Sequence, residues 1–345
     1  MVSGKSDIKR LEAKGFGGFY VNFAPTKSDL KATFDWLKGQ SYNGVQGVYC
    51  FDSGNSGLTF GVTIHTHGNE PCGLASLWAF QKLQELGTPF KGRIIFSLNN
   101  VEAAEKYWQP ENDPAEFKYR FLDANMNRVP KGFDPDNGKY TELEFQRAQE
   151  LCPIWREFDT GVDFHTTSQD APAMIIANEK LPLENVSALP IQHYLEGMAC
   201  AVESQFLTQL YGDGAGDMYM IECGQHEALE AFECAAKCFL SLSQSYGLVE
   251  DVYKPSLSED LMVYDVTESC FFPDGSYEQI EIFKNFASMK KGQLLAKGDG
   301  APVIAPFDGH ILMAPNVKKP AYLKEEMYFF SKPAVPVARK GCGCA

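Results

Sequence analysis

Several features that would assign a chain of this length to common classes of protein are missing. No segment approaches the roughly 18–20 consecutive apolar residues that a membrane-spanning helix needs, and mean hydropathy is −0.25. The first residues, MVSGKSDIKRLEAKG, contain no apolar stretch of the signal-peptide type. The ten cysteines include no CxxC pair, so they predict neither a zinc finger nor a disulfide framework. We therefore expect a cytoplasmic protein with no membrane partner.

Positive charge is also scarce. The chain has 31 Lys and Arg against 45 Asp and Glu, which gives a formal net charge of −14 at pH 7. Such a surface repels phosphate backbones, so we expect no nucleic-acid partner. An anionic small molecule would need a local cationic pocket. The 345 residues, 44% of them hydrophobic, otherwise suit a globular protein of about two domains.

Strand and helix patterns alternate through residues 1–252. Ser28 is the expected N-cap of the first helix, and Pro71 suits the first turn of the second. Such alternation predicts an α/β/α sandwich with a mostly parallel central sheet, whose ligand site lies at the carboxyl ends of the strands. The pattern predicts helices at 28–38, 71–87 and 227–246, and strands at 58–64, 93–98, 161–165 and 219–222.

Short β-like runs separated by Gly and Pro follow this region. They predict a small all-β domain, a barrel or a sandwich, at residues 256–335. We expect residues 1–50 to be an N-terminal extension that packs on the catalytic domain, and residues 336–345 to form a flexible tail.

The chemistry is carried first by His67 and Glu70, an H-x-x-E pair at a strand end. A catalytic zinc ion needs three protein ligands, often two His and one Glu, and an open position for water. His165, at the end of its own predicted strand, is the candidate third ligand among only six histidines. His65 competes with His67, but the spacing to Glu70 favours His67 and leaves His65 in the core or in support of the ligands. A pair of this kind alone is also compatible with an ordinary turn and helix start.

Four motifs occur in an order that resembles the succinylglutamate desuccinylase/aspartoacylase family, a branch of the zinc carboxypeptidase clan. The resemblance covers roughly residues 55–330 and includes the β domain that this family carries at its C-terminus. The motifs are His67-Gly68-Asn69-Glu70, RFLDANMNR (Arg120 to Arg128), Asp163-Phe164-His165-Thr166-Thr167 and Ile221-Glu222-Cys223-Gly224.

The resemblance implies a role for each matching residue. It implies one zinc ion per chain, a general acid/base that activates water and protonates the leaving amine, an arginine that polarises the scissile carbonyl, and an Asn-Arg pair that holds the substrate's α-carboxylate. The corresponding residues are His67, Glu70 and His165 for zinc, then Glu222, Arg120, and the pair Asn127 and Arg128.

These residues predict a zinc-dependent hydrolase that removes an acyl group from a small N-acyl amino acid. The alternatives are a metallocarboxypeptidase that cleaves short peptides and a non-catalytic zinc-binding scaffold, although a mere metal site needs neither Glu222 nor Arg120. Similar sites also accept cobalt or manganese. A homo-oligomer is compatible with the sequence.

The sequence departs from the family pattern around the second carboxylate of the substrate. Between His165 and Glu222 the chain has one cation, Lys180, among seven acidic residues, whereas members that use dicarboxylates place further cations there. We therefore expect the leaving amino acid to be neutral or cationic. Tyr277 and Tyr322 are the two β-domain candidates for reaching the cleft, and the sequence does not choose between them. His193, His226 and His310 are expected to be structural.

Overall fold

The computed structural model describes residues 24–109, 119–177, 181–202, 204–211, 216–254, 260–319 and 326–339. Helices in these ranges are α1 (Lys27–Lys38), α2 (Leu74–Glu85), α3 (Val101–Tyr107), α4 (Leu143–Trp155), α5 (Leu183–Ser187), α6 (Met198–Ala201) and α7 (Leu229–Ser245), with 3₁₀ turns η1 (Pro71–Gly73) and η2 (Leu207–Leu210). None of these helices is both long and apolar enough to cross a membrane.

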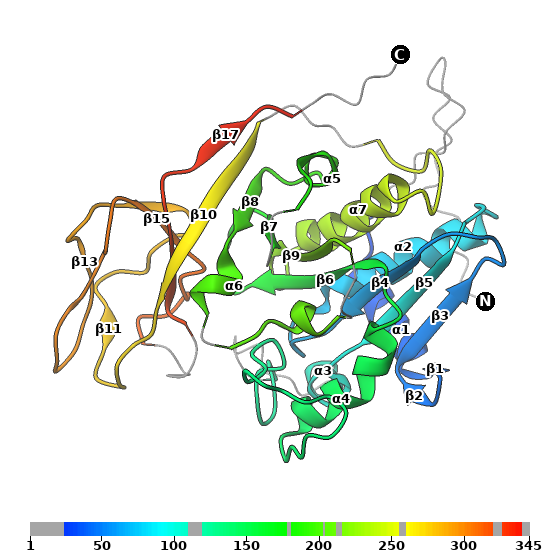
Figure 1. Cartoon of the computed structure of the whole chain (residues 1–345), viewed down its shortest axis with the longest axis horizontal. Coiled ribbons are helices and arrows are strands. Elements are labelled where there is room, and N and C mark those ends of the chain that lie inside the picture. Colours follow the sequence, from blue (N-terminus) through cyan, green and yellow to red (C-terminus); the bar gives the residue numbers. More distant parts are fainter. Residues whose placement is uncertain are drawn as a thin grey trace.

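Strands β3 to β10 build a central sheet in the order β3-β5-β4-β6-β9-β7-β8-β10 (Figure 1). Strands β5, β4, β6 and β9 run parallel to one another in its middle. The strands of this region are β1 (Ser41–Tyr42), β2 (Val45–Gln46), β3 (Val48–Asp52), β4 (Thr59–Ile64), β5 (Arg93–Leu98), β6 (Thr160–Thr167), β7 (Met174–Ala177), β8 (His193–Glu196), β9 (Met218–Gln225) and β10 (Leu261–Cys270).

Helices cover both faces of this sheet. On one face, α1, α2 and α7 pack on alternate strand residues such as Ile94 and Phe96. On the other face, α4 packs on Ile95 and Phe158. Parallel strands buried on both faces are expected to be continuously apolar, as β4 (TFGVTI) and β5 (RIIFSL) largely are. The predicted α/β sandwich with a mostly parallel sheet is therefore confirmed.

Some predicted boundaries differ from the structure. Helix α1 begins at Lys27 because Thr26, not Ser28, is its N-cap: the Thr26 hydroxyl accepts from the backbone N–H of Asp29, and the Asp29 carboxylate accepts from the backbone N–H of Thr26. Strand β6 continues to Thr167, so His165 lies inside it.

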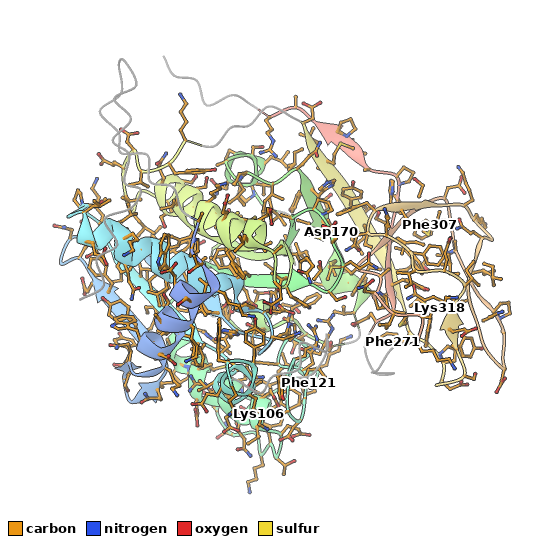
Figure 2. The ribbon with its side chains drawn as sticks, turned by 180° about the vertical axis from the view of Figure 1, so that it is seen from behind. Lys106, Phe121, Asp170, Phe271, Phe307 and Lys318 are labelled. Carbon is orange, nitrogen blue, oxygen red and sulfur yellow. The ribbon has the colours of Figure 1, made fainter. Side chains whose placement is uncertain are left out.

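The C-terminal strands continue from the central sheet through β10 (Figure 1). The first half of β10 pairs in parallel with β8, and its second half pairs antiparallel with β16. Figure 2 shows the side chains of this region, with Phe307 and Lys318 labelled. Its strands are β11 (Glu278–Gln279), β12 (Ala287–Met289), β13 (Leu294–Lys297), β14 (Val303–Ile304), β15 (Gly309–Leu312), β16 (Tyr328–Ser331) and β17 (Val335–Val337).

The start of the expected flexible tail is ordered on the sheet. Strand β17 pairs antiparallel with residues 261–263 of β10. Arg339 donates hydrogen bonds to the carbonyl oxygens of Ser187 (2.9 Å) and Leu189 (2.8 Å), and also to that of Ile191. Residues 340–345, like residues 1–23 of the N-terminal extension, lie outside the described ranges.

Candidate active site

The candidate site lies at the carboxyl ends of the parallel strands. His67 and Glu70 follow β4, where His65 turns the chain with a left-handed φ of 55°. His165 and Glu222 lie on the neighbouring strands β6 and β9, and their Cα atoms are partners in the register. The sheet therefore brings together residues that are more than 150 positions apart.

His67, Glu70 and His165 form a buried cluster that could hold a metal ion. One ligand atom from each lies within 4.8 Å of the others. The Nδ1 atom of His67 is 2.9 Å from Oε1 of Glu70, and the Nδ1 atom of His165 is 2.8 Å from Oε2 of the same carboxylate. Two imidazole nitrogens and one carboxylate are the donor set of many catalytic zinc sites.

The other nitrogen of each imidazole is held by an oxygen acceptor. Nε2 of His67 is 2.9 Å from Oδ1 of Asn125, and this oxygen also accepts the backbone N–H of Asn127. Nε2 of His165 is 2.8 Å from Oδ2 of Asp163. Acceptors at both Nε2 atoms favour the tautomers whose Nδ1 lone pairs face Glu70. A cation between these lone pairs and the carboxylate would satisfy all three, so the residues present fit a divalent metal ion.

Electrostatics keep Glu70 ionised. Burial alone would raise the pKa of its carboxyl, but the charges and hydrogen bonds of His67 and His165 outweigh it and hold that pKa well below its usual value. Burial lowers the pKa of His67, and the charge of Arg120 adds to this effect. Burial lowers the pKa of His165, but the charges and hydrogen bonds of Asp163 and Glu70 raise it well above its usual value. Because the neutral imidazole and the carboxylate are the forms that bind metals, a bound ion would displace a proton from His165.

Arg120 lies against the metal cluster because the chain passes close to Gly68. The Gly68 N–H donates to the carbonyl oxygen of Arg120 at 2.9 Å. A Cβ atom at position 68 would lie 2.4 Å from the carbonyl oxygen of Tyr119 and 2.5 Å from the backbone of Ala103, so this approach requires glycine. From there the Nη1 atom of Arg120 donates to Oε1 of Glu70 at 2.7 Å.

Glu222 is buried in the wall of a cavity beside this cluster. Its side chain is 6% exposed, and its Oε2 atom has no hydrogen-bond partner among the described residues. Burial, partly offset by the charge of His165, raises the pKa of the Glu222 carboxyl to about 7. A carboxyl with such a pKa can both accept and release a proton near neutral pH.

Asn127 and Arg128 have different surroundings: Asn127 packs in the interior, and Arg128 lines the cavity. Asn127 is 3% exposed, and its Oδ1 atom accepts the backbone N–H of Leu207 at 3.0 Å, so the structure does not bring its amide to the cavity. Arg128 does line the cavity. Its guanidinium packs over the ring of Phe206, 4.8 Å from the centroid, and pairs with Glu326.

The cavity itself has a volume of about 120 Å³. Residues of both the catalytic region and the C-terminal strands form its walls. They are Asn69, Glu70, Arg120, Arg128, Thr166, Thr167, Ser168, Glu222, His226, Asn285, Met313, Ala314, Pro315, Glu326 and Phe329.

Sequence reasoning missed part of this wall. His226 lines the cavity, and its Nδ1 atom is 2.8 Å from the hydroxyl of Thr166. Asn285 and Glu326 reach the cavity from the C-terminal region, although nothing in their local sequence marks them. Tyr277, the expected residue, is instead 2% exposed in the core of the C-terminal strands, and Tyr322 lies outside the described residues.

The remaining histidines outside the metal cluster do not line this cavity. His65 is fully buried, and its Nε2 atom accepts a hydrogen bond from Trp108 at 3.2 Å. His193 stacks on Phe286 with ring centroids 4.2 Å apart, and His310 is 3.1 Å from the carbonyl oxygen of Phe286.

Comparison by sequence identifies no relative: no protein-family model matches the chain, and no curated protein matches it. Comparison by structure identifies proteins of similar fold. Succinylglutamate desuccinylase from Vibrio cholerae has a TM-score of 0.63 and 14% identity, over 84% of this chain and 89% of that chain. The product-bound ectoine utilization protein EutE (DoeB) from Ruegeria pomeroyi has a TM-score of 0.58 and 16% identity, over 85% of this chain and 92% of that chain. A mutant of murine aminoacylase 3 has a TM-score of 0.55 and 16% identity, over 82% of this chain and 96% of that chain. The chain therefore has the fold of the succinylglutamate desuccinylase/aspartoacylase family proteins.

Proposed function

We propose that the protein is a zinc-dependent hydrolase that removes the acyl group from a small N-acyl amino acid. One observation carries this proposal: Glu70 of the His67, Glu70 and His165 cluster lines the same small cavity as Glu222 and Arg120. A binding scaffold would need only the first three residues. The additional buried carboxyl and the arginine are the groups that amide hydrolysis requires.

The ion would be held by Nδ1 of His67, Nδ1 of His165 and the carboxylate of Glu70. When bound, zinc lowers the pKa of a coordinated water to about 7 and polarises a carbonyl group. Asn125 and Asp163 orient the two imidazoles through Nε2.

Glu222 and Arg120 divide the remaining chemistry. The Glu222 carboxylate takes a proton from the attacking water and delivers it to the nitrogen of the leaving amine, which departs poorly as an anion. Arg120 donates to the oxygen on which negative charge develops. A single donor of this kind is typically worth about 3–4 kcal/mol in the transition state.

The cavity supports a small substrate over a peptide. Part of its wall comes from the C-terminal region, and its volume is about 120 Å³. The apolar residues there are Met313, Ala314, Pro315 and Phe329. This space suits an acyl group and one amino acid, whereas a metallocarboxypeptidase needs room for a longer chain. Arg128 is the residue that we assign to the α-carboxylate. A cytoplasmic location and a homo-oligomer stay predictions from the sequence.

The test is amine release from a panel of N-acetyl and N-succinyl amino acids and short peptides, with and without a chelator. We expect chelator-sensitive release from N-acyl amino acids. Glu222→Gln should abolish release and keep the bound zinc, whereas Glu85→Gln, at an exposed ion pair on α2, should change neither. Release from peptides alone would establish the carboxypeptidase, and bound zinc with no release from any substrate would favour the scaffold.

A further inference from the structure

Glu326 forms an ion pair with Arg128, the residue that we assign to the α-carboxylate of the substrate. The Arg128 Nε–H donates to the Oε2 atom of Glu326 at 2.9 Å and to its Oε1 atom at 3.2 Å, and Nη2 of Arg128 lies 2.9 Å from the same Oε2 atom. The Glu326 side chain is 3% exposed, so this is a buried, hydrogen-bonded ion pair. A buried ion pair in a cavity wall affects which charged substrate groups can bind in the cavity.

The pair leaves Arg128 able to bind one carboxylate end-on. The guanidinium has five N–H hydrogens. The described contacts engage the one on Nε and one on Nη1, the latter with the Asn127 carbonyl oxygen at 2.8 Å, while Nη2 lies beside Oε2 of Glu326. One hydrogen on each of Nη1 and Nη2 is left by these contacts. They form a fork that suits the α-carboxylate of a leaving amino acid.

A second carboxylate would find no uncompensated arginine among the described residues of the cavity wall. The charged residues of the cavity wall are three acids and two arginines, and each arginine is paired with an acid: Arg120 with Glu70 and Arg128 with Glu326. The arginine charges are therefore compensated before any substrate binds. The pair with Glu326 also leaves Oε1 with one long hydrogen bond, so this oxygen can accept another from a substrate donor.

Asn285 supplies a second polar group to the wall of the same cavity. Its Oδ1 and Nδ2 atoms are buried, and neither has a hydrogen-bond partner among the described residues. Buried amides without partners are rare because the loss of hydration is costly. Asn285 lines the cavity together with Glu326, so a substrate group can satisfy both.

We infer that Glu326 and Asn285 form a specificity subsite that selects a leaving amino acid with a cationic side chain and rejects one with a second carboxylate. This inference rests on the proposed deacylase function. Glu326 and the Asn285 carbonyl both accept the N–H bonds of an ammonium group. To an anion Asn285 offers only its uncharged amide NH2 group, which does not offset repulsion by the charged Glu326.

The experiment compares three N-acetyl amino acids of similar size and different charge. The full-length, zinc-loaded protein is assayed with the N-acetyl derivatives of 2,4-diaminobutyrate, asparagine and aspartate, each acetylated on the α-amine. We expect kcat/KM to fall in that order. Glu326→Gln keeps the size of the side chain and should lower the ratio of the first kcat/KM to the last at least tenfold. Glu85→Gln should leave the ratio unchanged.

Asn285→Asp is an independent variant, because it adds a carboxylate to the same wall. It should raise the same ratio at least tenfold. A preference for N-acetylaspartate in the unmodified protein would overturn the inference, and so would an unchanged ratio in folded Glu326→Gln. If Glu326→Gln does not fold, an unchanged ratio in Asn285→Asp would overturn it.

A binding measurement separates failure of the inference from failure of the proposed function. If none of the three compounds is hydrolysed, the proposal that the protein deacylates α-N-acetyl amino acids of this size is wrong. Calorimetry with free 2,4-diaminobutyrate and free aspartate then tests the subsite by itself. Tighter binding of 2,4-diaminobutyrate that Glu326→Gln removes would support it. Equal binding of the two, or binding of neither, would overturn it.

Discussion

Replacing Glu222 by Gln should stabilise the metal-free protein while it removes the proposed activity. The Glu222 carboxyl is buried, with one oxygen that has no hydrogen-bond partner among the described residues, and burial raises its pKa from 4.5 to about 7. A carboxyl whose pKa is raised in the folded state stays protonated there after the unfolded chain has lost its proton. The folded state then binds more protons, so stability falls as the pH rises from about 4.5 to about 7.

The size of this effect follows from the two pKa values. Their difference corresponds to a decrease of about 3 kcal/mol in the free energy of unfolding. This decrease is complete above pH 7 and is less than about 1 kcal/mol at pH 5. Gln has nearly the same volume and cannot ionise, so it avoids this loss. With an unfolding entropy of roughly 2.1 cal/mol/K per residue, 3 kcal/mol raises the midpoint of a chain of this length by about 4 °C if the chain unfolds as one unit.

The assay is thermal unfolding of chelated wild-type protein and Glu222→Gln at pH 5, 6, 7 and 8. We expect Glu222→Gln to unfold at a higher temperature at pH 8 and the difference to shrink towards pH 5. Added zinc should reduce the difference at pH 8, because a nearby cation stabilises the ionised carboxyl. Equal midpoints at pH 8 in chelator, or a difference that does not depend on pH, would refute the reasoning. The control is Glu85→Gln, because the Glu85 side chain is 64% exposed in the wild-type protein.

Three further predictions concern the groups around the metal cluster. Asp163→Asn should weaken zinc binding about 10–100-fold, measured with a competing chelator, because Asp163 orients His165 through a 2.8 Å hydrogen bond; unchanged affinity would contradict this role. Arg120→Ala should lower kcat about 100–1000-fold with zinc retained, as metal analysis and steady-state kinetics can show; loss of zinc instead would make Arg120 a structural residue. Gly68→Ala should lower both the unfolding temperature and kcat, because its Cβ would lie 2.4 Å from the carbonyl oxygen of Tyr119; wild-type values for both would mean that the chain there can move without cost.

The sequence predicts the metal cluster well because its residues belong to regular elements. His67, Glu70, His165 and Glu222 lie in or just after apolar strands whose pattern is strong, and parallel strands bring such positions to one edge of a sheet. The prediction that Ser28 is the N-cap of α1 was wrong for a local reason. Thr26 and Ser28 are both good N-cap residues, and only the reciprocal hydrogen bonds between Thr26 and Asp29 select the first.

The cavity wall was harder to predict because long-range contacts determine it. Glu326 is 198 residues from Arg128, and neither its neighbours nor any periodicity marks it as the partner. Asn127 belongs to the same motif as Arg128, but its amide caps the backbone of Leu207 instead of facing the cavity. A motif therefore specifies which residues are near a site, whereas their orientation depends on packing partners that a motif does not contain.

The groups proposed for chemistry and those proposed for specificity come from different parts of the fold, and this difference affects how such a site can change its substrate. The groups proposed for chemistry are on or beside β4, β6 and β9, where a shift of one residue would also disrupt the buried sheet. Asn285 and Glu326 come from segments between strands of the C-terminal region, where backbone and side chain can vary with less cost to the core. Reversing the charge at position 326 alone would leave Arg128 without its partner and add a cation to the wall. The preference for a cationic or an anionic leaving group can therefore switch without any change in the metal cluster, Glu222 or Arg120.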